Sequence, residues 1–399
     1  MVELKEKGNM INSRDLIRDM FRGVPVERVG LTDSPWSDTL LLWVQEGYPT
    51  RWVHKKIGQQ HWRKEDGQWE DVTEEDDYEE PVPPWQHFQY DMVGIGPWMD
   101  NMPLRDYEET IQETEEWKIT RNGAGASFKY WIHKMGTPEH MDFRMKSRDI
   151  WERDYRSYLL RLDPLRIDTD ELRGNREEAD QSQAWTHYGH MFIWELMRQS
   201  MGDFTLYESL LLDPAWVHDF CQVYTEFYKM HFNFMFEKAG LPDGIWIYED
   251  LGYKNGLFAS PKVLKNLIFP YFHELVTFFH SKELPVVLHS CGSQAAALDL
   301  IVEAGFDGLN PMERKAKDND PFLFAERYGE KLVLIGGMDV RIFESNDKDL
   351  IKKEVTHYLD GMKKRGARLL FASDHSITPN VHYDTYRYVL DVYRDHMFY

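Results

Sequence analysis

Pro285-Val-Val-Leu-His-Ser-Cys-Gly292 is a short apolar run that ends in three polar residues and a glycine. Its β-branched and apolar residues predict a buried strand over 286–289, and Gly292 breaks the strand. A helical pattern follows from Ala295 to Ala304. A buried strand that ends in polar residues just before a helix is typical of α/β folds, whose chemistry lies at the carboxyl ends of the strands.

The polar end of this strand carries a candidate pair of metal ligands. In an extended segment, residues two positions apart point to the same face, so His289 and Cys291 can converge on one ion. An imidazole and a thiolate are a zinc-type pair. A histidine near a cysteine in a core strand more often reflects packing, so the metal hypothesis needs further ligands from other strand ends.

The second half of the chain repeats one pattern, a short apolar strand followed by a helix. This alternation predicts a parallel sheet. Several strand-helix units in series, with more of them upstream, favour a closed (β/α)8 barrel with N-terminal helical and β-hairpin elaborations. An open doubly wound sheet is the alternative. The candidate strands after residue 185 are 190–194, 244–248, 286–289, 308–313, 331–335 and 368–372.

The first half is less regular. Residues 12–22 predict an amphipathic helix with Ser13 as its N-cap. The acid-rich segment near 64–84 is interpreted as a solvated surface loop. Residues 115–131 alternate around Asn122-Gly123, which is the signature of a β-hairpin. No linker separates two domains, so we expect a single domain over 1–399, with 1–185 as its elaborated N-terminal part.

Composition restricts the partners and the compartment. The formal net charge of −21 argues against nucleic acid and against anionic lipid surfaces, both of which need a basic patch. Only two cysteines, Cys221 and Cys291, favour a reducing cytosol. The N-terminus has no apolar signal core, and no run of about 18 apolar residues occurs. We therefore expect a soluble, cytoplasmic protein.

Acid, imidazole and thiol groups recur at successive strand ends, which share one rim in a barrel. The best ligand set is His289, Cys291 and His375, since three ligands and an open position make a catalytic zinc site. Glu249 or Glu313 would add an oxygen ligand or bond to the ligands. Helix capping or core hydrogen bonding is the alternative for several of these residues. The strand-end residues are Glu249, Asp250, His289, Cys291, Glu313, Asp339, Asp374 and His375.

Several motifs along nearly the whole chain together resemble one family. The chain resembles the uroporphyrinogen decarboxylase superfamily, and within it the corrinoid-dependent methyltransferases more than the true decarboxylases. The most specific segment is Leu288-His-Ser-Cys-Gly292. The other segments are 13–28 with Gly23-Val-Pro-Val-Glu-Arg28, Trp43–Pro49, Tyr130–His140, Tyr248–Gly252, Gly336–Asp339 and Ser373–Pro379.

The resemblance implies a (β/α)8 barrel with its active site at the C-terminal mouth. In the methyl-transferring branch, a His-x-Cys pair and a distant cysteine hold zinc; these positions correspond to His289, Cys291 and His375. The third position is an imidazole here, which makes the site less electron-rich. True decarboxylases carry an arginine-rich segment where this chain has 32–38, with Asp33 and Asp38. A polycarboxylate porphyrinogen would therefore be poorly held.

We accordingly expect a zinc-dependent methyltransferase that works with a corrinoid protein, and a demethylating direction is favoured. Zinc would act as a Lewis acid. The resemblance leaves two alternatives, a metal-independent decarboxylase and a non-catalytic binding partner of a corrinoid or tetrapyrrole. We expect Glu249, Asp250 and Asp374 to orient ligands or supply a proton, and Trp36, Glu313 and Asp339 to contact the substrate.

Overall fold

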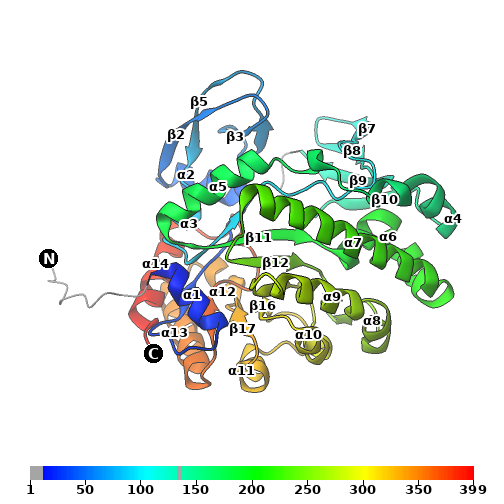
Figure 1. Ribbon diagram of the computed structural model, residues 1–399. Helices are drawn as coiled ribbons and strands as arrows, with labels where there is room; N and C mark the ends of the chain where they lie inside the picture. Colours follow the sequence, from blue (N-terminus) through cyan, green and yellow to red (C-terminus); the bar gives the residue numbers. More distant parts are fainter. Residues whose placement is uncertain (1–11, 133–136) are drawn as a thin grey trace.

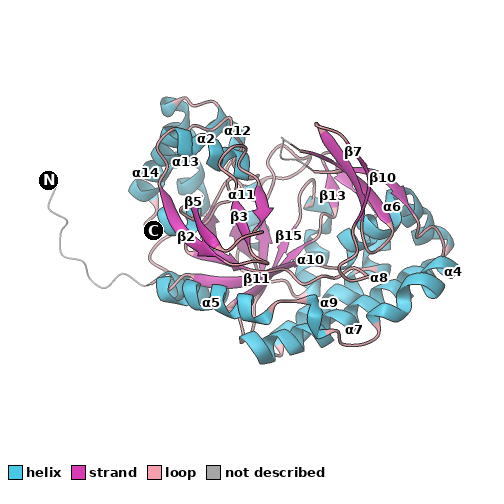
Figure 2. Cartoon of the chain, turned by 90° about the horizontal axis from the view of Figure 1, so that it is seen from above, coloured by secondary structure: helices cyan, strands magenta, loops and turns pink. Residues whose placement is uncertain are grey.

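A closed barrel of eight parallel strands forms the centre of the protein (Figures 1 and 2). The computed structural model describes residues 12–132 and 137–399. Neighbouring strands in the barrel are also consecutive among the barrel strands along the chain, which excludes the open doubly wound sheet. The strands are β1 (Gly30–Leu31), β6 (Met92–Ile95), β11 (Trp185–Met191), β12 (Gly244–Tyr248), β15 (Val286–His289), β16 (Gly308–Asn310), β17 (Val333–Ile335) and β18 (Leu369–Phe371).

The barrel closes between its first two strands through Asp91, just before β6. The backbone N–H of Asp91 donates to the carbonyl of Leu31 (2.7 Å), and its carboxylate accepts from the N–H of Leu31 (2.7 Å). Arg28 donates to both carboxylate oxygens of Asp91, at 2.8 and 2.7 Å. This ion pair therefore joins the ends of the sheet where strand β1 is only two residues long.

Helices cover the outside of the barrel, as the alternation predicted. Ser260 caps α8 by accepting from the N–H of Val263, and Pro261 occupies the first helical position, both as expected from the sequence. In the described residues, no helix is both long and apolar enough to cross a membrane. The helices that follow the barrel strands include α2 (Ser37–Gln45), α5 (Thr169–Ser182), α6 (Ile193–Leu212), α7 (Pro214–Ala239), α8 (Pro261–Leu267), α9 (Phe269–His280), α10 (Leu298–Ala304), α11 (Pro321–Tyr328), α12 (Val340–Glu344), α13 (Lys348–Lys364) and α14 (Tyr383–His396).

Helix α1 (Ser13–Phe21) closes the N-terminal end of the barrel. Its apolar face, with Leu16, Ile17 and Met20, belongs to the same buried cluster as the inward-facing side chains of β6, β11, β12, β15, β17 and β18. The prediction that Ser13 caps this helix was wrong. Asn12 is the cap, since its side chain accepts from the N–H of Asp15 (2.8 Å). The hydroxyl of Ser13 instead donates to Asp91 (2.6 Å).

The acid-rich segment near 64–84 is not a plain surface loop, so that prediction is corrected. It contains β4 (Trp69–Asp71) and β5 (Asp76–Pro81), which pair antiparallel with β3 (Gln60–Trp62) and β2 (Thr50–Lys55) respectively. Several of the acids are held by bases of the same insertion: Glu80 contacts Lys55 (2.9 Å), and Glu79 contacts Lys64. Composition alone indicated solvation, whereas the pair between Lys55 of β2 and Glu80 of β5 joins the two strands of a sheet.

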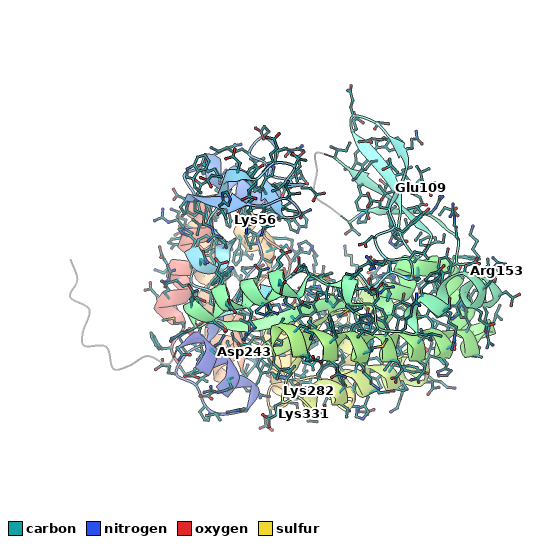
Figure 3. The ribbon with its side chains drawn as sticks, turned by 45° about the horizontal axis from the view of Figure 1, so that its top comes forward. Lys56, Glu109, Arg153, Asp243, Lys282 and Lys331 are labelled. Atoms are coloured by element: carbon teal, nitrogen blue, oxygen red, sulfur yellow. The ribbon has the colours of Figure 1, made fainter. Side chains whose placement is uncertain are left out.

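A second insertion forms a four-stranded antiparallel sheet, β7 (Glu109–Glu113), β8 (Trp117–Arg121), β9 (Ala126–Trp131) and β10 (Glu139–Phe143). The predicted hairpin is confirmed as β8 and β9, and the side chain of Asn122 accepts from the N–H groups of Ala124 and Ala126 in the turn. Lys56 of the first insertion and Glu109 of the second stand on the same side of the barrel in Figure 3. Residues 133–136 of the motif at 130–140 lie outside the described residues.

Candidate active site

A cavity of about 670 Å³ opens at the carboxyl ends of the barrel strands. Strands β11, β12, β15 and β16 contribute side chains to it, as do the loops after β1 and β18. Trp69 and Thr137 belong to the two insertions, so both insertions reach the cavity. This is where (β/α)8 barrels hold their active sites. The residues discussed below that line it are Asp33, Trp36, Gly94, His187, Trp246, Tyr248, His289, Cys291, Asn310 and His375.

Three potential ligand atoms converge at the edge of this cavity: His289 and Cys291 line it, and Asp250 lies beside them. His289 Nε2 lies 3.5 Å from Cys291 Sγ and 3.9 Å from a carboxylate oxygen of Asp250. One ligand atom from each of the three residues lies within 4.8 Å of the other two. The predicted convergence of His289 and Cys291 is therefore present, and the carboxylate beside them belongs to Asp250.

Asn310 fixes the orientation of the His289 ring. The side-chain oxygen of Asn310 is 2.7 Å from His289 Nδ1, so Nδ1–H donates to it and Nε2 keeps its lone pair. Burial lowers the pKa of His289, against the opposing effects of Asp250 and Asn310. The neutral imidazole thus directs Nε2 toward Cys291, which is how a protein prepares a histidine for a metal.

Backbone hydrogen bonds fix the position of Cys291. Asp250 accepts from the N–H of Cys291 (2.7 Å), and Glu313 accepts from the N–H of Gly292 (2.7 Å). Gly292 has φ 75°, and a Cβ there would fall 2.4 Å from the carbonyl oxygen of Gly252, so only glycine fits this turn. Burial raises the pKa of the Cys291 thiol well above its ordinary value, and the nearby carboxylates add to this effect.

His375 lines the same cavity but lies outside the group of three. Its ring contacts Trp36 edge-on, with centroids 5.4 Å apart, and its Nδ1 lies 3.2 Å from the carbonyl of Ser376. Trp36 also lines the cavity, where substrate contact was predicted. The ligand role of His375 stays a prediction. The carboxylate whose oxygen lies within 4.8 Å of the ligand atoms of His289 and Cys291 is that of Asp250, which was predicted as a catalytic residue.

The remaining predicted acids support loops and helices around the mouth. Glu249 is fully buried and accepts from the N–H of Glu195 (2.9 Å) in α6, and burial raises its pKa well above the ordinary range. Asp374 accepts from the N–H groups of Arg314 (2.9 Å) and Val340 (3.0 Å). Asp339 caps α12. None of these three side chains is among the described residues that line the cavity.

Asp33 is a cavity residue that the sequence-based set lacked. Its carboxylate accepts from the hydroxyls of Ser373 (2.7 Å) and Tyr386 (3.2 Å) and from the N–H of Ser34 (3.0 Å). Burial raises its pKa to about 6, although these hydrogen bonds oppose the shift. Its place two residues after the end of strand β1 is the signal that could have identified it.

The donor set fits a zinc ion. Imidazole, thiolate and carboxylate are the three zinc ligand types, and the hydrogen bond between His289 and Asn310 is the support that a ligating histidine ordinarily has. A divalent cation would also offset the burial and negative charge that keep the Cys291 thiol protonated. Within 12–132 and 137–399, the cavity lining contains no lysine or arginine.

Comparison with protein families gives a match over half of the chain. The model of the family uroporphyrinogen decarboxylase (URO-D) matches residues 194–396. These residues run from α6 to the end of α14 and include strands β12 to β18, and with them His289, Cys291 and His375. A comparison with curated protein sequences finds no match.

Among solved structures, the chain is similar to a methyltransferase from Methanosarcina mazei, with a TM-score of 0.62 and 14% identity over 96% of this chain and 99% of the other. At this identity the similarity establishes the fold alone. An AP endonuclease of family 2 from Brucella melitensis (TM-score 0.34, 11% identity, 59% and 86% covered) and a 3-keto-D-glucoside 4-epimerase from E. coli (0.31, 10%, 57% and 82%) are too distant to carry an argument.

Proposed function

Because the chain belongs to the uroporphyrinogen decarboxylase family, we propose that it is a zinc-dependent methyltransferase that works with a corrinoid protein. The methyl group would pass between a small methylated substrate, or a thiol, and the corrinoid. The observation that carries this proposal is the convergence of Asp250 with His289 and Cys291, two residues that line the cavity. The fold shared with a protein described as a methyltransferase is consistent with it.

The residues have separate tasks in this proposal. His289 Nε2, Cys291 Sγ and the Asp250 carboxylate would hold the zinc ion, with Asn310 fixing the imidazole. Zinc would supply Lewis-acid polarisation of the heteroatom that carries or receives the methyl group. His375 is the predicted further ligand, and Trp36 would contact the substrate.

The cavity favours this reaction over decarboxylation of a porphyrinogen. Several carboxylates on a substrate would need cationic partners, and the described cavity lining offers none. Asp33 occupies the region that is arginine-rich in the decarboxylases. The site also lies inside a formed cavity with potential ligands, which favours an enzyme over a binding partner without catalysis.

Metal content tests the proposal directly. The chain is purified without chelator and its zinc is measured by mass spectrometry in wild type, His289→Ala, Asp250→Asn and His375→Ala. We expect about one zinc per chain in the wild type and a loss in His289→Ala. His273→Ala is the matched control, because His273 is an exposed histidine on α9. Zinc-free wild type would remove the proposal, and the other two variants show whether Asp250 or His375 completes the site.

Methyl transfer is then tested with free cobalamin in place of the partner protein. Conversion of cob(I)alamin to methylcobalamin is followed spectrophotometrically with candidate methylated donors, and the reverse reaction with candidate thiols. We expect turnover that His289→Ala abolishes and His273→Ala preserves. Zinc binding with tight cobalamin binding, but without turnover on any donor or thiol, would favour the non-catalytic alternative.

A further inference from the structure

His187 and Trp246 form the floor of the cavity beneath the candidate metal site. They lie on the neighbouring strands β11 and β12, and their rings stack with centroids 4.8 Å apart and 28° between their planes. Trp185, the inward-facing residue two positions before His187, packs in the buried cluster that contains α1. Trp246 belongs to this cluster as well, so the cavity borders the cluster at His187 and Trp246, where its lining is aromatic.

The floor contains polar atoms that the protein leaves without partners. His187 Nδ1 and Trp246 Nε1 are buried and have no hydrogen-bond partner within the described part of the chain. An unpaired buried polar atom is uncommon, because leaving it without a partner costs about 1–3 kcal/mol. Since Nδ1 is shielded and His187 nevertheless lines the cavity, the imidazole presents another part of its ring to the cavity.

Gly94 leaves that part of the imidazole uncovered. Gly94 pairs with His187 across strands β6 and β11, and it also lines the cavity. A Cβ at Gly94 would lie 3.2 Å from Cε1 and 3.6 Å from Nε2 of His187. Any side chain at position 94 would therefore cover the Cε1–Nε2 edge, and glycine keeps this edge open.

The floor is also uncharged. Burial lowers the pKa of His187 to about 3, so its imidazole is neutral at physiological pH. One nitrogen of a neutral imidazole donates and the other accepts, so Nε2 can bond a hydroxyl group in either tautomer. Asp33, the carboxylate among the lining residues named above, already accepts from Ser373 and Tyr386.

Aromatic rings connect this floor with the candidate metal site. The ring centroids of Trp246 and Tyr248 are 6.3 Å apart, and those of Tyr248 and His289 are 5.0 Å apart. Trp98 packs beside Tyr248, at 5.3 Å. Tyr248 therefore lies between Trp246, which stacks on His187, and His289. Flat aromatic surfaces favour a flat apolar ligand by stacking and by burial of its faces.

We propose that His187 determines substrate specificity by hydrogen bonding a hydroxyl group on an uncharged aromatic substrate, through its Cε1–Nε2 edge. The substrate ring would pack against Trp246 and Tyr248, with its reacting end directed toward His289 and Cys291. This proposal rests on the proposed function for the identity of the reacting end. The binding of the ring and its hydroxyl is independent of that function.

Calorimetric titration of the purified, full-length protein with phenol and toluene tests the subsite, because the two probes have the same shape and only phenol carries a hydroxyl. We expect the wild type to bind phenol more tightly than toluene by on the order of 10-fold, because toluene would leave Nε2 of His187 without a hydrogen-bond partner. In His187→Phe, the preference should fall to about 2-fold or less. His273→Phe, on the protein surface, should keep the wild-type preference.

Gly94→Ala provides a second test that keeps His187 in place, in case His187→Phe fails to fold. Covering the Cε1–Nε2 edge should reduce phenol binding more than toluene binding. An unchanged preference for phenol in folded His187→Phe and Gly94→Ala would overturn the proposal. Equal binding of phenol and toluene to the wild type, or no binding of either, would also overturn it. Tighter binding of a charged probe, tetramethylammonium or benzoate, than of phenol would overturn it as well.

The outcome of this titration is separate from that of the zinc and methyl-transfer measurements. Selective phenol binding in a protein without zinc would remove the proposed function and leave the subsite. Zinc binding and methyl transfer without a preference for phenol would leave the function and remove the role of His187.

Discussion

The ion pair that closes the barrel leads to a quantitative prediction about stability. Asp91 is 1% exposed, and its carboxylate accepts from Ser13, from Leu31 and from two nitrogens of Arg28. Replacing Asp91 by alanine leaves a largely buried guanidinium and a buried backbone N–H without this partner. Breaking a buried pair from one side costs about 3–5 kcal/mol, so we expect Asp91→Ala to lower the free energy of unfolding by about 4 kcal/mol.

Urea unfolding followed by tryptophan fluorescence and by far-ultraviolet circular dichroism measures this loss. Glu303→Ala is the control: Glu303 pairs with Lys265 at 2.9 Å, but both side chains are more than half exposed, so a loss of at most about 0.5 kcal/mol is expected. The double variant Arg28→Met/Asp91→Leu should recover much of the loss, because no charge stays buried without a partner. A loss below about 1 kcal/mol in Asp91→Ala would refute this account of barrel closure.

Two further predictions concern the cavity. Asn310→Leu removes the acceptor that orients His289 and should weaken zinc binding by about 10- to 100-fold, measured by competition with a chromophoric chelator. Asn310→Asp keeps an acceptor and should bind zinc about as tightly as the wild type. Equal zinc affinities of Asn310→Leu and the wild type would contradict the role of His289 as a ligand. Burial raises the pKa of Asp33 to about 6, so the native state holds this proton more tightly than the unfolded chain and loses stability as the carboxyl ionises. When the pH rises from about 5 to about 7, the unfolding free energy of the wild type should therefore fall by about 1 kcal/mol more than that of Asp33→Asn. Urea unfolding at the two pH values measures this difference, and an equal change in the two proteins would contradict the prediction.

The sequence predicted the barrel well because the strand-helix alternation is local. Strand β12 was predicted with its observed bounds, and β15 likewise. The strand predicted over 190–194 was wrong in position. Strand β11 spans Trp185–Met191, and helix α6 begins at Ile193. His187 lay outside the expected strand for this reason, so its inward-facing position could not be seen.

The candidate site could be predicted only in part, because distances across a barrel depend on register. His289 and Cys291 are two positions apart, so a local rule placed them together. Asp250 joins them because β12 and β15 pair in register, with Tyr248 opposite His289. Glu249, one position earlier, points instead to the start of α6. A polar residue at a strand end thus indicates the rim of the barrel, but its neighbour along the chain can face the opposite way.

Helix α1 makes the assembly of this barrel depend on contacts between segments that are far apart in the sequence. Leu16, Ile17 and Met20 leave the ribosome before the barrel strands do, yet they pack in a cluster that also contains Leu370 of strand β18. Contacts this distant in sequence form late and slow folding. A nascent chain therefore exposes the apolar face of this amphipathic helix until strand β18 has been synthesised, and chaperones would have this face as a target throughout that interval.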